Sequence, residues 1–481
     1  MKLTQIQINN FRSIKELIFN IIPVFDSNTY TLLGINESGK SNFLKAIHSI
    51  ESDIIVYPQD FYDDTKEVEL SLKYQLSVEE NIELKEELSN KYKFDENILQ
   101  KIEIGDIDIK IKFSPSNPTA KTTTEVVKFK EIIFEKYTYD PTDNIVKEKI
   151  VITQEDFNIE QFFHNILPLY FWKISHHITF WKSSPEYLIS EEIDLNLFAS
   201  SPGEVSIPLQ NCFELAEITD IPKEIAKLNN SVSIQNLEDK LGDSVTAHIN
   251  KVWPEHPIKI KFKINYNKLT FLIEDNEVKY KVKTTNQRSD GFRQFISFLL
   301  TLSAENLTEE LQNSILLLDE PETHLHPSAQ INLKNELIKI SQNKNNNIVF
   351  FATHSNYMID KSNIDRCYKV FKKENSKTEL EIIEKTNTSY SEVNYKIFEI
   401  ATNDYHNELY GYLEDIDVSK LNSLEKNKIW INEKTGKSEQ VSLAKYIRHS
   451  IHHPENTSNI KFSEDELKKS IDILQKLKYK E

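Results

Sequence analysis

Residues 34–41 read Gly-Ile-Asn-Glu-Ser-Gly-Lys-Ser, and this stretch decides the fold class. It matches the pattern GxxxxGK[ST] at every defined position. An apolar run, TYTLLG at 29–34, leads into it, and NFLKAIHSI at 42–50 follows with apolar residues at helical spacing. A strand, a glycine-containing loop and a helix in this order predict a loop whose backbone N–H groups surround phosphate oxygens.

The residues of this loop have expected roles in binding ATP. Lys40 is expected to reach the β- and γ-phosphates, and the hydroxyl of Ser41 is expected to bind Mg²⁺. The chain has only 8 glycines in 481 residues, whereas about 7% is usual. Three of the eight fall in two short motifs, which predicts that those motifs need glycine's backbone conformations. The expected nucleotide-binding residues of the loop are Asn36, Glu37, Ser38, Gly39, Lys40, Ser41 and Asn42.

Two further apolar runs predict buried parallel strands that end in polar residues. SILLLDE at 314–320 places two acids at a strand end. Asp319 is expected to hold Mg²⁺ through water, and Glu320 to orient and polarise the attacking water. IVFFATHS at 348–355 is the next such run, and its His354 could reach a γ-phosphate. Alternating strands and helices predict an α/β sheet.

A third motif, RSDGFRQ at 288–294, opens a predicted helix just upstream of the acidic strand. The hydroxyl of Ser289 and the N–H of Gly291 could bind a γ-phosphate at that helix N-terminus. An ordinary N-cap would have the same residues, so the motif alone leaves both interpretations open.

Taken in chain order, five motifs resemble the ABC-type ATPase heads of the SMC, RecF and OLD group. The motifs are INNFRSI, GINESGKSN, RSDGFRQ, LLLDEPETHLHP and ATHS, within residues 1–75 and 270–360. The resemblance implies that Arg12 touches nucleotide phosphate, that Glu320 is the catalytic carboxylate and that His354 is the switch histidine.

The same resemblance implies a homodimer or higher homo-oligomer. ATP would be sandwiched between two copies of the chain, with Ser289 and Gly291 of one copy completing the site of the other. The glutamine that such heads place near the nucleotide would be Gln59 or Gln75.

The expected architecture is an α/β ABC-type P-loop ATPase head that is discontinuous in sequence. Its N-terminal lobe is predicted at 1–75, and its C-terminal lobe, with the signature turn, acidic strand and switch histidine, at 269–387. A β-rich and helical insert is predicted at 76–268, and a helical C-terminal domain at 388–481.

Composition excludes several other classes. The formal charge of −17 argues against a protein that coats DNA, because such binding neutralises phosphates with surface cations. The alternating lysines of IKIKFKI at 258–264 are a weak candidate for nucleic-acid contact. Two cysteines cannot build a disulfide framework or a four-cysteine metal site. No apolar run approaches the roughly 18 residues of a membrane span, so we expect a cytoplasmic protein without a membrane partner.

Features that the chain lacks indicate which members of this group it resembles most. The chain has no sustained heptads for a long coiled coil. The DxD at 415–417 lies in helical sequence without a preceding apolar strand, unlike the strand-borne acids of the Toprim nuclease domain. The chain therefore resembles the stand-alone ATPase subunits of anti-phage systems such as PARIS and Septu. That resemblance implies ATP hydrolysis, a phage protein as trigger and a separately encoded nuclease effector gated by the nucleotide state.

Two alternative functions remain open. Arg448 and His453 fit the Arg-x-x-x-x-His pattern of HEPN ribonucleases, which would make the chain a toxin regulated by its ATPase head. The same residues could equally serve packing or partner docking. The other alternative is a RecF-like DNA-repair ATPase.

Overall fold

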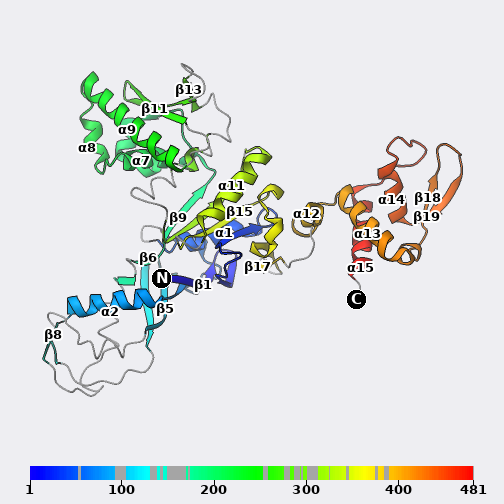
Figure 1. Cartoon of the computed structure of the whole chain (residues 1–481), viewed down its shortest axis with the longest axis horizontal. Helices are drawn as coiled ribbons and strands as arrows, with labels where there is room; N and C mark the ends of the chain where they lie inside the picture. Colours follow the sequence, from blue (N-terminus) through cyan, green and yellow to red (C-terminus); the bar gives the residue numbers. More distant parts are fainter. Residues whose placement is uncertain are drawn as a thin grey trace. The chain divides into compact units, whose positions relative to one another are not determined.

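The computed structural model divides the chain into two compact units, Met1–Ile383 and Glu384–Glu481, both drawn in Figure 1. No helix within the described part of the chain is long and apolar enough to cross a bilayer. The structure describes residues 1–51, 56–92, 104–129, 138–140, 145–148, 170–171, 174–252, 258–275, 282–285, 293, 296–298, 300, 312–323, 325–342, 346–373, 377–383 and 389–479.

The centre of the first unit is a six-stranded sheet with the order β17-β16-β3-β15-β14-β9. Five neighbouring strands are parallel, and only β17 runs antiparallel, to β16. Because they are parallel, β3, β14 and β15 bring their carboxyl ends to one edge of the sheet. The strands are Thr29–Leu33 (β3), His177–Lys182 (β9), Ser314–Asp319 (β14), Ile348–Thr353 (β15), Cys367–Lys372 (β16) and Thr378–Ile382 (β17).

Helices cover both faces of this sheet, which explains why its central strands are apolar on both sides. Alternate residues of β14 belong to two different cores. Ile315 and Leu317 share one core with helix α1 (Lys40–His48). Leu316 and Leu318 share the other with α11 (Pro327–Ile340).

A second, antiparallel sheet has the order β2-β1-β4-β5-β6. An aromatic cluster joins it to the main sheet: Phe19 of β2 has ring centroids 5.1 Å from Tyr30 of β3 and 5.6 Å from Phe43 of α1. The helix α2 (Val78–Tyr92) follows β4. The strands are Lys2–Phe11 (β1), Ile14–Asn20 (β2), Val68–Gln75 (β4), Ile104–Ser114 (β5) and Asn117–Phe129 (β6).

A separate core lies under a small sheet of order β10-β12-β11, with β13 beside β12. Strands β11 and β12 form a hairpin with Tyr266 and Asn267 at its turn, both with positive φ. Its elements are Glu192–Asp194 (β10), Leu195–Ser200 (α5), Pro202–Val205 (α6), Ile207–Leu215 (α7), Ile221–Ala226 (α8), Ser231–Val252 (α9), Ile258–Asn265 (β11), Lys268–Asp275 (β12) and Val282–Thr284 (β13).

The lysines of β11 share one face, as their alternation predicted, but acids accompany them. Lys261 pairs with Glu274 at 2.6 Å, and Lys263 pairs with Glu238 at 3.1 Å. These ion pairs neutralise the face locally, so it offers little attraction for nucleic-acid phosphates.

The range 76–268, predicted as an insert, is distributed over three parts of the first unit. It supplies β5 and β6 to the antiparallel sheet, β9 to the edge of the main sheet, and most of the separate core. A six-residue strand such as β9 carries too little periodicity to be assigned to a sheet from sequence. Two short paired strands, Thr138–Asp140 (β7) and Ile145–Glu148 (β8), also fall in this range.

The second unit is helical, as predicted, with one hairpin that the sequence analysis did not foresee. Residues 415–417 fall within the range of α13, whose backbone is kinked at Asp417 (φ −154°, ψ 83°), so these acids do not follow a strand. The core of this unit packs α13, α14 and α15 together. Its elements are Tyr390–Phe398 (α12), Asn403–Asn422 (α13), Lys428–Ile431 (β18), Ser438–Val441 (β19), Leu443–His452 (α14) and Glu464–Tyr479 (α15).

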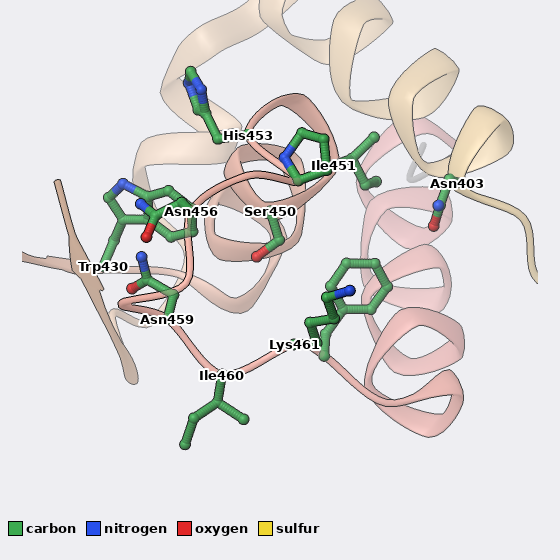
Figure 2. Close-up of a pocket in the computed structure, with 11 residues that line it drawn as sticks. Asn403, Trp430, Ser450, Ile451, His453, Asn456, Asn459, Ile460 and Lys461 are labelled. Carbon is green, nitrogen blue, oxygen red and sulfur yellow. The ribbon is translucent and has the colours of Figure 1, made fainter. Parts of the chain in front are cut away.

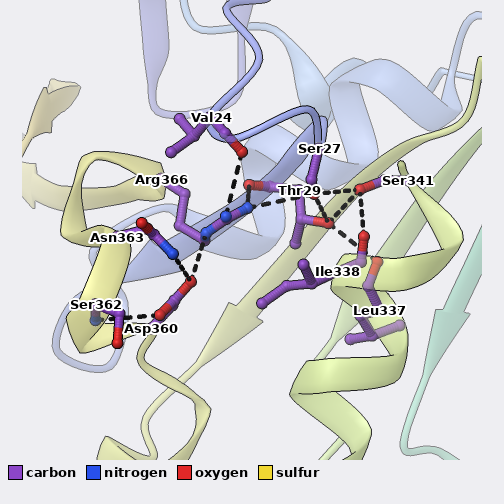
Figure 3. Close-up of polar contacts among 10 residues, drawn as sticks. All are labelled: Val24, Ser27, Thr29, Leu337, Ile338, Ser341, Asp360, Ser362, Asn363 and Arg366. Carbon is purple, nitrogen blue, oxygen red and sulfur yellow. Dashed lines mark hydrogen bonds and ion pairs between the residues drawn. The ribbon is translucent and has the colours of Figure 1, made fainter. Parts of the chain in front are cut away.

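A buried polar network stabilises the amino-terminal edge of the main sheet (Figure 3). Arg366, 2% exposed, donates to Asp360 at 2.9 Å and to the hydroxyl of Ser27 at 3.3 Å. The hydroxyls of Ser27 and Thr29 lie 2.7 and 2.6 Å from that of Ser341. The network thus ties the loop before β3 to the end of α11 and to the start of β16.

Candidate nucleotide-binding site

The loop between β3 and α1 has a backbone that requires its two glycines. Gly39 has φ 112°, and a Cβ there would lie 2.2 Å from Oγ1 of Thr378. A Cβ on Gly34 would lie 2.3 Å from the carbonyl oxygen of Val370. Glu37 also has positive φ, and it is exposed together with Asn36. Such alternation of backbone conformations turns successive N–H groups into a concave anion site.

Lys40 begins α1 and is 5% exposed. Its Nζ donates to the carbonyl oxygens of Gly34 at 2.8 Å and Ile35 at 3.1 Å, and it lies 3.0 Å from Nε2 of His354. Burial lowers the pKa of Lys40 to about 8, against the attraction of nearby acids led by Glu320. To bind a phosphate oxygen, the ammonium must exchange at least one of these contacts.

Ser41 and Asp319 form the pair that could hold a divalent cation. The hydroxyl of Ser41 donates to Oδ1 of Asp319 at 3.1 Å. Burial raises the pKa of Asp319, and this hydrogen bond partly opposes the rise. One hydroxyl and one carboxylate suit Mg²⁺, which keeps waters and takes phosphate oxygens for its remaining positions. No group of three or more His, Cys, Asp or Glu suited to a metal occurs among the described residues.

Glu320 and His354 meet at the carboxyl ends of β14 and β15. Nε2 of His354 lies 3.3 Å from Oε1 of Glu320. The hydrogen bond with His354 lowers the pKa of Glu320, so the carboxyl group is ionised at neutral pH. A carboxylate with a lowered pKa is a weak base, and it is better suited to orienting and polarising a water than to removing its proton early.

Glu322, two residues after Glu320, is 5% exposed. The hydroxyl of Thr353, the residue before His354, donates to Oε1 of Glu322. Burial raises the pKa of Glu322 to about 7. The segment that carries the candidate catalytic residues therefore includes a buried carboxyl group that titrates near neutrality.

Arg12 reaches the site from the turn between β1 and β2, where its φ is 51°. Its Nε donates to Oδ1 of Asp60 at 2.6 Å, and its NH1 donates to Oδ1 of Asn42 at 3.4 Å. Asp60 stands in no motif of the sequence and is buried at the end of the short helix Pro58–Asp60. An isolated aspartate in a loop gives no signal of its own.

The two glutamine candidates lie far apart. Gln59 is exposed and directly precedes Asp60. Gln75 pairs with Lys2, at the opposite end of β1 from Arg12. Gln59 is therefore the candidate at the edge of the site. Ser289 and Gly291 lie outside the described residues, so their expected role stays a prediction.

Arg448 and His453 of the second unit point to different neighbours. Arg448 donates to Oδ1 of Asn407 at 3.1 Å and lies over the ring of Tyr410. The ring of His453 lies 6.4 Å from that of Trp430. The two residues of the Arg-x-x-x-x-His pattern therefore contact different side chains.

Figure 2 shows the pocket that His453 lines, which has a volume of about 230 Å³. Arg448 is not among its lining residues. The lining residues are Asn403, Trp430, Ser450, Ile451, His453, Pro454, Asn456, Asn459, Ile460, Lys461 and Phe462.

The fold is that of a P-loop ATPase head: a mostly parallel sheet, a glycine-dependent loop between β3 and α1, and acids at the end of the next strand but one. The model of the AAA ATPase domain family matches residues 1–359, most of the chain, and the chain belongs to this family.

Two relatives are similar to this chain. The Old nuclease of Escherichia phage P2 is 22% identical over 422 residues, which cover 84% of this chain and 66% of the nuclease. An uncharacterized protein of Methanocaldococcus jannaschii is 26% identical over 137 residues, covering 27% of this chain and 35% of that protein. The chain thus spans less than two thirds of the length of either relative. Together with the family match, the first relative confirms the expected resemblance to the SMC and OLD group.

Two solved structures also resemble it. The SMC head domain from Thermotoga maritima has a TM-score of 0.37 at 11% identity and covers 80% of this chain and 100% of that one. The SMC head bound to the C-winged helix domain of ScpA has a TM-score of 0.39 at 13% identity, with coverages of 79% and 97%.

Proposed function

We propose that this chain binds ATP with Mg²⁺ at the loop of residues 34–41 and hydrolyses it. The observation that supports this most is the contact of Lys40 and Glu320 with the same nitrogen of His354, at 3.0 and 3.3 Å. A phosphate-binding lysine, a carboxylate and a histidine thus share one small volume beside the pair of Ser41 and Asp319.

Different residues of the chain would have different roles in phosphoryl transfer. The N–H groups of the loop and the ammonium of Lys40 would bind the phosphate oxygens. Ser41 and Asp319 would hold Mg²⁺. The bound ion would neutralise the negative charge that develops on the phosphates. The ionised Glu320 would orient the attacking water, and His354 would turn from Lys40 toward the γ-phosphate.

The finer function that we propose is control of a partner. A second copy of the chain would complete the site through Ser289 and Gly291, so that ATP closes a homodimer and hydrolysis opens it. A relative called a nuclease suggests that the nucleotide state controls nucleic-acid cleavage. Since Asp415 and Asp417 fall within the range of α13 and not at the end of a strand, we place that cleavage on a separately encoded nuclease effector. The setting would be cytoplasmic defence against phage, with a phage protein as trigger.

The experiment that tests this proposal uses Glu320→Gln, which keeps the size of the side chain and removes its charge. Phosphate release from ATP should fall by about 100-fold or more. In the presence of ATP and Mg²⁺, the mass of the Glu320→Gln variant measured by light scattering should be that of a dimer or a higher oligomer. The matched control is Glu336→Gln on α11, where Glu336 is half exposed and paired with Lys339; it should hydrolyse ATP like the wild type. Absence of turnover in the wild type would refute the ATPase, and a monomeric Glu320→Gln with ATP would refute the ATP-closed dimer.

A further inference from the structure

Thr378, the first residue of β17, lies against the phosphate loop although it is far from it in sequence. The side chain is fully buried. Its Oγ1 donates to the carbonyl oxygen of Ser38 at 3.1 Å, and its atoms fill the space where a Cβ of Gly39 would be. Thr378 therefore touches both residues that the Ser38–Gly39 peptide bond joins.

The bond to Ser38 fixes the direction of that peptide. In a planar trans peptide the C=O and the N–H point in opposite directions. When Thr378 holds the carbonyl of Ser38, the N–H of Gly39 is turned away from Thr378. Anion sites of this kind depend on such fixed N–H directions.

A chain of hydrogen bonds orients the hydroxyl of Thr378. The carbonyl of Ser38 can only accept, so Thr378 uses its proton there and must accept from Ser13, whose Oγ lies 2.7 Å away. Ser13 in turn accepts from the amide of Asn42 at 2.7 Å, and Asn42 accepts from Arg12 at 3.4 Å. Each residue of this chain donates to the next, in the order Arg12, Asn42, Ser13, Thr378 and Ser38. Hydrogen bonds that point in the same direction polarise one another.

The backbone ties the same two strand ends together. The N–H of Thr378 donates to the carbonyl oxygen of Ser13 at 2.8 Å. The turn that carries Arg12, the start of β17 and the phosphate loop are thus held as one assembly.

We propose that Thr378 is a positioning residue for nucleotide binding, which sets the phosphate loop in its binding conformation through its hydroxyl. This inference rests on the proposed function. A purely space-filling role would need only the shape of the side chain, whereas positioning needs the hydroxyl.

The test compares Thr378→Val, which keeps the shape and removes the hydroxyl, with Thr378→Ser, which keeps the hydroxyl. Titration of ATP with Mg²⁺ should show an affinity about fivefold to tenfold weaker for Thr378→Val, the effect of one hydrogen bond. Thr378→Ser should bind within about twofold of the wild type. The matched control is Thr179→Val, since Thr179 is buried in β9 and its hydroxyl has no partner among the described residues. It should bind like the wild type.

An affinity of Thr378→Val within twofold of the wild type would overturn the inference while leaving the proposed function intact. If the wild type itself failed to bind ATP, that result would refute the proposed function, and the inference about Thr378 that rests on it. Should Thr378→Val not fold, Ser13→Ala carries the same test, because it interrupts the chain of hydrogen bonds one step earlier. It should weaken binding by about threefold, and an unchanged affinity would again overturn the inference.

Discussion

The side chain of His354 lies between two residues of opposite charge, with Nε2 3.0 Å from Nζ of Lys40 and 3.3 Å from Oε1 of Glu320. The same ring nitrogen cannot accept a hydrogen bond from Lys40 and donate one to Glu320 at once. Its bonding partner therefore depends on where its proton lies. The histidine at the end of β15 thus links the residue expected to bind phosphate with the residue expected to orient water.

His354→Ala should separate binding from turnover. Without the imidazole, Lys40 loses a contact that competes with phosphate, so ATP affinity should be equal to or tighter than that of the wild type. Turnover should fall by about 100-fold, because the group nearest to Glu320 is lost. Binding titrations and phosphate release measure the two effects. His326→Ala, at an exposed histidine before α11, should change neither; loss of affinity in His354→Ala would contradict the account.

Gly39→Ala should damage the loop in two ways. The positive φ disfavours alanine, and the new Cβ would collide with Thr378. We expect a loss of about 2 kcal/mol or more in the free energy of unfolding, together with weaker ATP binding. Gly411→Ala is the matched control, because a Cβ at this position of α13 would meet no atom within 4 Å beyond the adjacent backbone of its own helix. That change should be neutral or stabilising by up to about 1 kcal/mol in denaturant unfolding.

The buried carboxyl group of Glu322 should make stability depend on pH. Burial raises its pKa from 4.5 to about 7 in the folded chain. Between these values the folded state holds the proton more tightly than the unfolded state, so the contribution of this group to stability is present at low pH. It is lost as the pH rises toward and through 7.

Glu322→Gln removes this titration and keeps an acceptor for Thr353. The free energy of unfolding of the variant minus that of the wild type should increase from pH 5 to pH 8, by at most about 3 kcal/mol. Unfolding midpoints at the two pH values measure it. A difference between variant and wild type that stays constant with pH would show that Glu322 does not titrate in this range.

Arg366→Met should be among the more destabilising single changes outside the site. It leaves the buried carboxylate of Asp360 without its guanidinium partner, which costs about 3 kcal/mol. In the double variant with Asp360→Asn, the loss should be smaller than the sum of the single losses. The exposed pair of Lys339 and Glu336 is the comparison, and Lys339→Ala should cost less than about 1 kcal/mol. Denaturant unfolding curves measure these free energies. Equal losses for Arg366→Met and Lys339→Ala would contradict the account.

Local motifs carried most of the information about the site. The phosphate loop, Asp319, Glu320 and His354 follow apolar strands directly, and parallel strands deliver their carboxyl ends to one edge. Thr378 and Asp60 could not be predicted in this way. Each reaches the site through tertiary contacts over long sequence distances, and neither stands in a pattern of its own.

The same distinction explains the fold. Stretches with a clear pattern, such as the helix that follows the loop of residues 34–41 and the apolar strands β14 and β15, form as predicted. The short strands β9, β18 and β19 did not stand out, because four to six residues fit several patterns equally well. Their pairing partners depend on the packing of the whole unit.

The most direct test of the central claim is a calorimetric titration of ATP, with Mg²⁺, into the wild type and into Lys40→Ala. Lys339→Ala, which removes an exposed lysine of α11, serves as the control. We predict saturable binding by the wild type and the control, and binding at least about 100-fold weaker for Lys40→Ala, because the buried ammonium is the side-chain cation that the loop itself supplies. Binding by Lys40→Ala at the affinity of the wild type would contradict the assignment of residues 34–41 as the nucleotide site.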